Sequence, residues 1–127
     1  MRLALACALG AGGAAEARGG RNPAEITVTE LRARREADLV LLDGRVTNTG
    51  ERHADHVVLV IQFLAPGRQI VSVREMPLVE GRFEAGEEAD FSLETASQPR
   101  VVEVRVEAKD RGGREYKVIR PGPYRIE

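Results

Sequence analysis

Both histidines of the chain, His53 and His56, lie in the stretch GERHADHVV, beside Glu51 and Asp55. Zinc is bound by imidazole nitrogens and carboxylate oxygens, and a catalytic zinc commonly has three protein ligands. These side chains could converge only in a loop, because residues three apart in an extended strand point to opposite faces. An isolated H-x-x-H pair is a weak motif. The sequence therefore favours a polar loop over a metal site, and we expect no cofactor.

Nucleophilic chemistry has no motif in the sequence. Ser72, Ser92 and Ser97 fall in predicted strands or a turn, without the Gly-rich elbow that exposes a nucleophile. Neither a phosphate-binding loop nor a dinucleotide fingerprint occurs in the sequence. We therefore expect no catalytic residues and a protein that is not an enzyme.

Charge in this chain is dense but balanced, with 19 basic and 20 acidic residues and a net charge of −1. Nucleic-acid binding usually needs a basic excess, because contacts to phosphates supply much of the affinity. The chain has no Trp, three Phe and two Tyr, too few for a platform on which bases stack. We therefore expect no nucleic-acid partner.

One basic cluster, formed by Arg32, Arg34 and Arg35, could bind an anionic component of the cell envelope. Glu30 and Glu36 flank it, which favours a mixed and solvated surface. Arginines on a first strand at the edge of a sheet would also discourage unwanted pairing.

The N-terminal residues 1–17, MRLALACALGAGGAAEA, have a basic start, a short apolar run and an A-x-A end. This order is typical of a secretory signal peptide and predicts an extracytoplasmic protein, periplasmic or secreted. Cys7, the single cysteine, lies in this segment, so cleavage after Ala17 leaves a mature chain without a thiol. The alternative is a lipoprotein anchored through acylated Cys7, because LALAC resembles a lipobox.

The rest of the chain alternates apolar and polar residues with period two, which predicts half-buried strands. Seven such runs that follow one another with only short breaks between them are typical of an immunoglobulin-like β-sandwich. We expect an all-β domain over residues 26–120, after a flexible linker at 18–25 and before a C-terminal tail at 121–127. Whether residues 32–38 form strand or helix is open. The seven runs are 26–34, 38–48, 56–64, 69–76, 89–95, 101–109 and 114–119.

Turn residues separate these runs. Ala65-Pro66-Gly67-Arg68 fits a type II turn, in which Pro presets φ and Gly takes the positive φ of the second central position. Asp110-Arg111-Gly112-Gly113 predicts a hairpin between the last two strands. Pro77 is expected to end the fourth strand or to place it at an edge.

The stretch GRVTNTGERHADHVVLVIQFLAPGRQIV, followed by FEAGEEADFSL, resembles the FxLYD family of bacterial extracytoplasmic Ig-like domains. It is also similar to CARDB-type adhesion-related modules, and the similarity covers about residues 44–93. Ile61-Gln62-Phe63-Leu64-Ala65 occupies the place of the motif that names the family but keeps none of its residues. The resemblance implies an Ig-like fold and an extracytoplasmic location. Its elements are Gly44, Val46, Asn48, Gly50, Gly67, Gly86, Glu87 and Phe91.

The sequence as a whole predicts a non-catalytic exported Ig-like module for protein interaction or envelope structure. Its partner would be an envelope or secreted protein. The alternative is a periplasmic metal- or small-ligand-binding protein that uses the His53–His56 loop, with Asp55 and Glu51 as further ligands.

Overall fold

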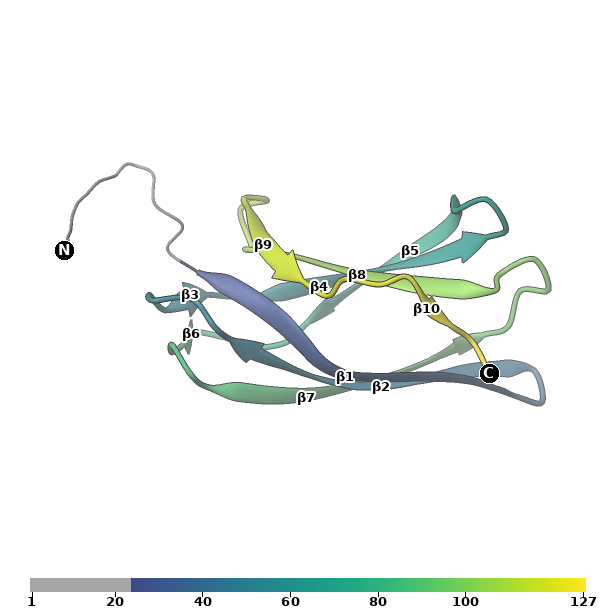
Figure 1. Ribbon diagram of the computed structural model, residues 1–127, viewed down its shortest axis with the longest axis horizontal. Coiled ribbons are helices and arrows are strands. Elements are labelled where there is room, and N and C mark those ends of the chain that lie inside the picture. The colour runs from purple at the N-terminus through teal and green to yellow at the C-terminus, as the bar shows by residue number, and fades with distance from the viewer. Residues whose placement is uncertain (1–23) are drawn as a thin grey trace, which may run out of the picture.

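The computed structural model describes residues 24–127, and this part of the chain consists of strands, turns and bends without a helix (Figure 1). The prediction of an all-β domain is therefore confirmed for these residues. The predicted signal peptide, Cys7 and all but the last two residues of the predicted linker lie outside the described residues. Residues 24–127 contain no helix of the length and apolarity that a bilayer crossing requires.

Seven long strands match the seven predicted runs, each ending within two residues of the expected position. Residues 32–36, whose state the sequence left open, are strand, and a turn at Ala37-Asp38 follows them. Three two-residue strands were not predicted, namely β3 (Ala54–Asp55), β6 (Arg82–Phe83) and β10 (Tyr124–Arg125). The long strands are β1 (Glu25–Glu36), β2 (Leu39–Asn48), β4 (Val58–Ala65), β5 (Gln69–Pro77), β7 (Glu88–Ala96), β8 (Glu103–Lys109) and β9 (Glu115–Ile119).

The long strands form one mixed sheet in the order β5-β4-β8-β9-β1-β2-β7, and β10 pairs with β8. All long-strand neighbours are antiparallel except β1 and β9, which pair in parallel through residues 25–27 and 117–119. The sheet curls over on itself, so that β5, β4, β8 and β9 lie above β1, β2 and β7 (Figure 1). β3 and β6 form a separate two-stranded sheet.

The core lies between these two layers and follows the predicted alternation in β2, β4 and β8. Val104 is fully buried and the adjacent Arg105 is half-buried, so the predicted register of β8 is confirmed. Phe91 of β7 is 6% exposed, as expected for an anchor between the layers. The buried residues that alternate along these strands are Val40, Leu42 and Val46 of β2, Leu59, Ile61 and Phe63 of β4, and Val104, Val106 and Ala108 of β8.

β1 departs from simple alternation. Val28 pairs with Val46 and Glu30 pairs with Arg45, so Thr29 is an extra residue that forms a β-bulge. The inward face therefore passes from Val28 to the half-buried Leu31, which packs against the core, and not to the exposed Glu30. The first residues of β1 lie between β2 and β9. Its Arg-rich half pairs with β2 on one side, and on the other side Ala33 is bridged by Ile126 while Arg35 N donates to Glu127 O.

The predicted turns form as expected. Gly67 has a φ of 81°, and Arg68 N donates to Ala65 O at 3.0 Å, as a type II turn requires. Asp110 closes the β8–β9 hairpin, because its carboxylate accepts from Arg114 N at 2.8 Å. β5 ends at Pro77 and pairs only with β4, so it is an edge strand.

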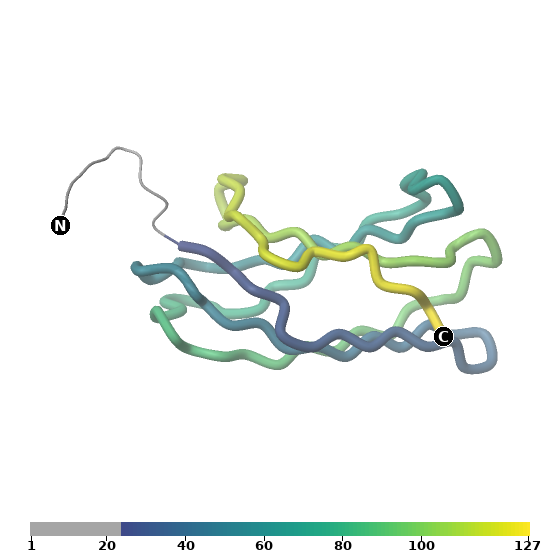
Figure 2. Tube along the Cα trace, viewed as in Figure 1, coloured from purple at the N-terminus to yellow at the C-terminus, as the bar shows by residue number. Residues whose placement is uncertain are grey.

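The segment 121–127, expected as a tail, is part of the sheet. Tyr124 pairs with Val104 through β10, and Ile126 makes a parallel bridge to Ala33 of β1. Figure 2 shows the chain end beside the far end of β1, where Glu127 N donates to Ala33 O at 2.9 Å.

Candidate functional site

Residues 49–57 connect β2 to β4, as predicted for the histidine-containing stretch, and include β3. Asn48 anchors this loop and is completely buried. Its side-chain amide donates to Arg52 O and to Phe83 O, both at 2.9 Å, and its Oδ1 accepts from Gly50 N at 3.0 Å. One side chain therefore fixes the start of the loop and ties it to β6.

Gly50 is required for close packing and not for a positive φ, since it is not among the residues with one. A Cβ at this position would lie 2.5 Å from Glu25 N and 2.8 Å from Ala24 Cα, so glycine is needed for the close approach to the start of β1.

The two imidazoles have different partners. His53 is exposed, and its Nε2 lies 3.5 Å from Asp55 Oδ2. His56 has a φ of 50°, and its Nδ1 accepts from Gly81 N at 3.3 Å while its own backbone N donates to Gly81 O at 2.8 Å. His56 thus joins the loop to the segment before β6, whereas His53 pairs with its neighbour. Glu51 is exposed and adds no ligand to either ring.

No group of three or more His, Cys, Asp or Glu side chains that could hold a metal occurs between residues 24 and 127. The Nδ1 acceptor role of His56 places the proton of its neutral ring on Nε2, because a ring nitrogen that accepts a hydrogen bond cannot carry a proton. The stretch is a structured polar loop in which His56 stabilises the backbone.

Tyr116 of β9 is a residue of this loop that the sequence did not reveal. Its hydroxyl donates to Asp55 O at 3.0 Å and accepts from Asp55 N at 3.1 Å, so it holds β3 against the β8–β9 hairpin. Burial raises the pKa of the Tyr116 phenol above its ordinary value, partly opposed by the backbone hydrogen bond to Asp55. No local motif identifies this contact, because 61 residues separate the partners.

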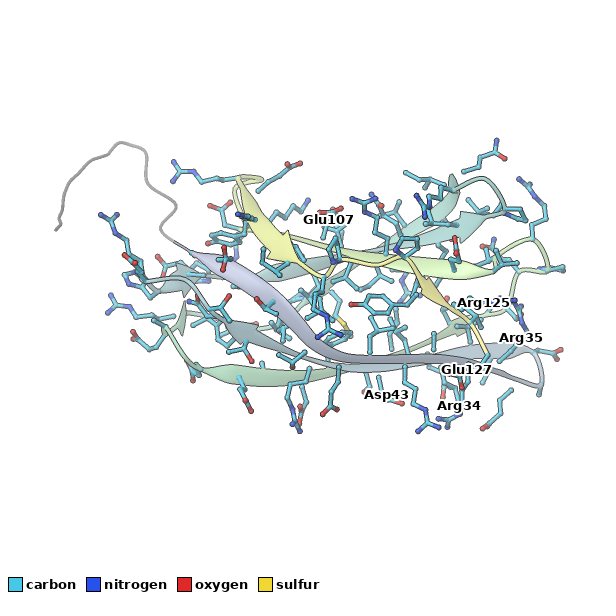
Figure 3. All side chains as sticks on the ribbon, viewed as in Figure 1. Arg34, Arg35, Asp43, Glu107, Arg125 and Glu127 are labelled. Atoms are coloured by element: carbon cyan, nitrogen blue, oxygen red, sulfur yellow. The ribbon has the colours of Figure 1, made fainter. Side chains whose placement is uncertain are left out.

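The arginines of the cluster have different partners, and Figure 3 shows Arg34 and Arg35 near the end of β1. Arg35 reaches from β1 to the β7–β8 connection, where its guanidinium donates to Ser97 Oγ at 2.6 Å and to Val101 O at 2.5 Å. Arg34 pairs with Glu36 at 3.2 Å. Arg35 therefore joins the two layers, and this use of the side chain leaves it poorly placed to bind an anion.

A cleft of about 820 Å³ lies beside the bulge of β1. The Phe91 ring fills the place of a Cβ on Gly44, where such an atom would lie 2.4 Å from Phe91 Cζ. Arg45 pairs with Asp90 at 2.7 Å and with Glu30 at 3.7 Å, so charges on the wall neutralise each other. The cleft is polar and broad. Its other lining residues are Val28, Thr29, Leu31, Arg32, Asp43, Ser92, Arg120 and Tyr124.

The free edge at β5 is the most apolar exposed feature. Ile70 is 54% exposed and Val73 is 47% exposed, and the one other exposed large hydrophobic residue of the described part is Leu39. β7 is the edge at the other end of the sheet order, and its exposed positions carry Glu88, Asp90 and Glu94. The two edges therefore differ in chemistry, and β5 is the candidate surface for contact with another protein.

Among known proteins, no family model matches the chain, and no curated protein matches it. IrmA from Escherichia coli has a similar structure, with a TM-score of 0.51 and 16% identity over 84% of this chain and 99% of IrmA. At this identity the similarity concerns the fold alone, and it places the chain among small all-β domains.

Two further structures are more distant. The alkylpurine DNA glycosylase AlkC from Pseudomonas fluorescens matches with a TM-score of 0.39 and 14% identity, over 79% of this chain and 31% of AlkC. A β-glucosidase from Kluyveromyces marxianus matches with a TM-score of 0.40 and 15% identity, over 82% of this chain and 15% of the glucosidase. Scores this low carry no argument about fold or function.

Proposed function

We propose that the protein is a non-catalytic, exported Ig-like module that binds another protein of the cell envelope or contributes to envelope structure. The Ig-like assignment is supported by the division of the long strands into layers. β1, β2 and β7 correspond to strands A, B and E, and β4, β8 and β9 correspond to C, F and G. β5 lies beside β4 and not beside β7, a variation compatible with the sandwich architecture.

The interaction function is carried by the free edge of β5. An edge strand presents unpaired backbone N–H and C=O groups, and a partner can add a strand to them. Ile70 and Val73 place exposed apolar side chains on this edge, where a partner would bury them. A purely structural edge is usually blunted by charge, as the acidic residues of β7 illustrate.

A non-catalytic role is supported by the pairing of charged groups in the cleft beside the β1 bulge. Arg45 is held between Asp90 and Glu30, an arrangement that stabilises the sheet surface. The alternative function, metal or small-ligand binding through the His53–His56 loop, has less support because the two rings bond to different segments.

A site-specific photo-crosslinker tests the proposal in the native host. We expect a crosslinker at Val73 to form an adduct with a protein of the envelope or the secreted fraction. The same group at Ser92, which is exposed on the β7 edge, should form none. Equal adducts from both positions, or from neither, would contradict a β5 interaction surface.

Export is tested separately by fractionation and mass spectrometry of protein from the same host. We expect a mature N-terminus after Ala17 in the extracytoplasmic fraction. A diacylated Cys7 would instead identify the lipoprotein alternative, and an intact Met1 in the cytoplasm would contradict export.

A further inference from the structure

We infer that the partner at the β5 edge is a second copy of this chain, paired antiparallel about a twofold axis at Val73. The inference rests on the proposed interaction function and names the partner for it. Two copies joined in this way would continue the upper layer, β9-β8-β4-β5, into a sheet that runs across both protomers.

The charges of the two free edges favour β5 for self-pairing. The exposed positions of β7 carry Glu88, Asp90 and Glu94 with no basic residue in the strand, and although Asp90 is paired with Arg45 of β2, Glu88 and Glu94 would repel their copies on a second β7 edge. β5 has one base, Arg74, and one acid, Glu75, so two β5 edges approach without net repulsion. Charge thus disfavours self-association through β7 relative to self-association through β5.

The position of the axis follows from the side chains of β5. Like charges would oppose each other across an axis at Arg74 or at Glu75. An axis at Ser72 would place Val71, the residue inserted in the β4–β5 register, in both of the pairs next to the axis. An axis at Val73 avoids the like-charge contacts and moves Val71 one pair farther from the axis.

With the axis at Val73, each pair across the dimer is compatible. Val73 faces its own copy, Glu75 faces Val71, and Arg74 faces Ser72. Val73 pairs with the half-buried Gln62 and Arg74 with the fully buried Ile61 on β4, which places Val73 on the outer face and Arg74 toward the interior. The central contact of the dimer is therefore an apolar pair on the outer face.

Arg74 does not obstruct this pairing. An inward-pointing charge can protect an edge strand, because pairing would bury it without a partner. Here the Arg74 guanidinium donates to Thr95 Oγ1 of its own chain at 3.0 Å, and Ser72 Oγ donates to Gln98 Oε1 at 3.1 Å. Each side chain has a partner within its own protomer, and Arg74 is exposed, so its other N–H donors stay in contact with solvent when a second copy pairs with the backbone edge.

Sedimentation equilibrium of the full chain tests the association. We expect a concentration-dependent dimer, weakened at least about tenfold by Val73→Lys, which places two ammonium groups at the axis. Ser92→Lys on β7 is the matched control and should leave the dimer unchanged. A chain that stays monomeric, or a dimer insensitive to Val73→Lys, would overturn the inference.

Cysteine crosslinking tests the register, in a Cys7→Ser background. Paired residues on antiparallel strands have Cα atoms about 4.5–5.5 Å apart, within reach of a disulfide. Val73→Cys should therefore crosslink to its own copy under mild oxidation, whereas Glu75→Cys should not. Crosslinking at Glu75→Cys and not at Val73→Cys would overturn the assigned axis.

The outcomes separate the dimer from the function on which it rests. A monomeric chain whose Val73 crosslinker captures a different envelope protein would refute self-pairing and keep the interaction function. A monomeric chain with no adduct at Val73 would refute both.

Discussion

Asn48 offers the sharpest test of how the fold is held together. Asn48→Ala removes two amide donors and one acceptor from a fully buried position, which leaves Phe83 O, Arg52 O and Gly50 N without these partners. Each such hydrogen bond contributes about 0.5–1.5 kcal/mol net, and an unpaired buried group costs about 1–3 kcal/mol. We expect the free energy of unfolding to fall by about 3 kcal/mol.

Asn48→Asp should make the free energy of unfolding depend on pH. The new carboxyl keeps an acceptor for Gly50 N, but its second oxygen faces the Arg52 and Phe83 carbonyls that the amide served. Burial and these oxygens disfavour its charged form, so its folded pKa lies above the unfolded value of about 3.9. A raised folded pKa gives stability that is present below the unfolded pKa and lost as pH rises through the folded pKa. Relative to the unsubstituted chain, Asn48→Asp should therefore be most destabilised near neutral pH.

Urea titrations followed by far-UV circular dichroism at neutral and mildly acidic pH measure both effects. Gln69→Ala removes an amide from an exposed position of β5 and is the control, with an expected change within about 0.5 kcal/mol. The reasoning fails if Asn48→Ala costs no more than Gln69→Ala, or if Asn48→Asp matches the unsubstituted chain at neutral pH.

Three further predictions concern the core, the loop and its tyrosine. Gly44→Ala should lower the melting temperature and cost about 1–3 kcal/mol, because its Cβ would lie 2.4 Å from Phe91 Cζ. Calorimetry should show no stoichiometric binding of zinc. A stoichiometric isotherm that disappears when His53 and His56 are both replaced by alanine would restore the metal-binding alternative. Tyr116→Phe should cost about 1 kcal/mol at neutral pH. Because the folded pKa of Tyr116 is raised, its contribution should be lost as pH rises through that pKa, and a cost that instead persists at high pH would contradict the assignment.

The strands and turns could be predicted because their causes are local. Period-two alternation depends on neighbouring residues alone, and Pro66 with Gly67 determines a turn within four positions. The same locality explains why the hairpin at Asp110 formed as expected. The Ig-like arrangement, in contrast, concerns which strands pair, and that depends on contacts between distant segments.

The loop shows where local reasoning ends. The bond that Gly50 N donates to Asn48 Oδ1 is local, because only two positions separate the partners. The bond from Asn48 to Phe83 O joins residues 35 positions apart, and the bond between Tyr116 and Asp55 spans 61 positions, so neither has a local motif. The sequence shows that His53 and His56 lie close together in the chain. It does not show that His56 Nδ1 accepts a hydrogen bond from Gly81 N.

The bulge in β1 follows from the way the whole sheet curls. β1 pairs along its length with β2 of one layer, while its first residues pair in parallel with β9 of the other. A strand in this position must turn as the sheet curls, and an inserted residue supplies a local bend and increased twist. Thr29 supplies it and bonds through its Oγ1 to Arg45 O at 3.1 Å. The extra residue shifts which side chains of β1 face the core, so that Leu31 points inward and Glu30 pairs with Arg45 on the outer face. One inserted residue therefore determines both the packing of β1 and the wall of the cleft beside it.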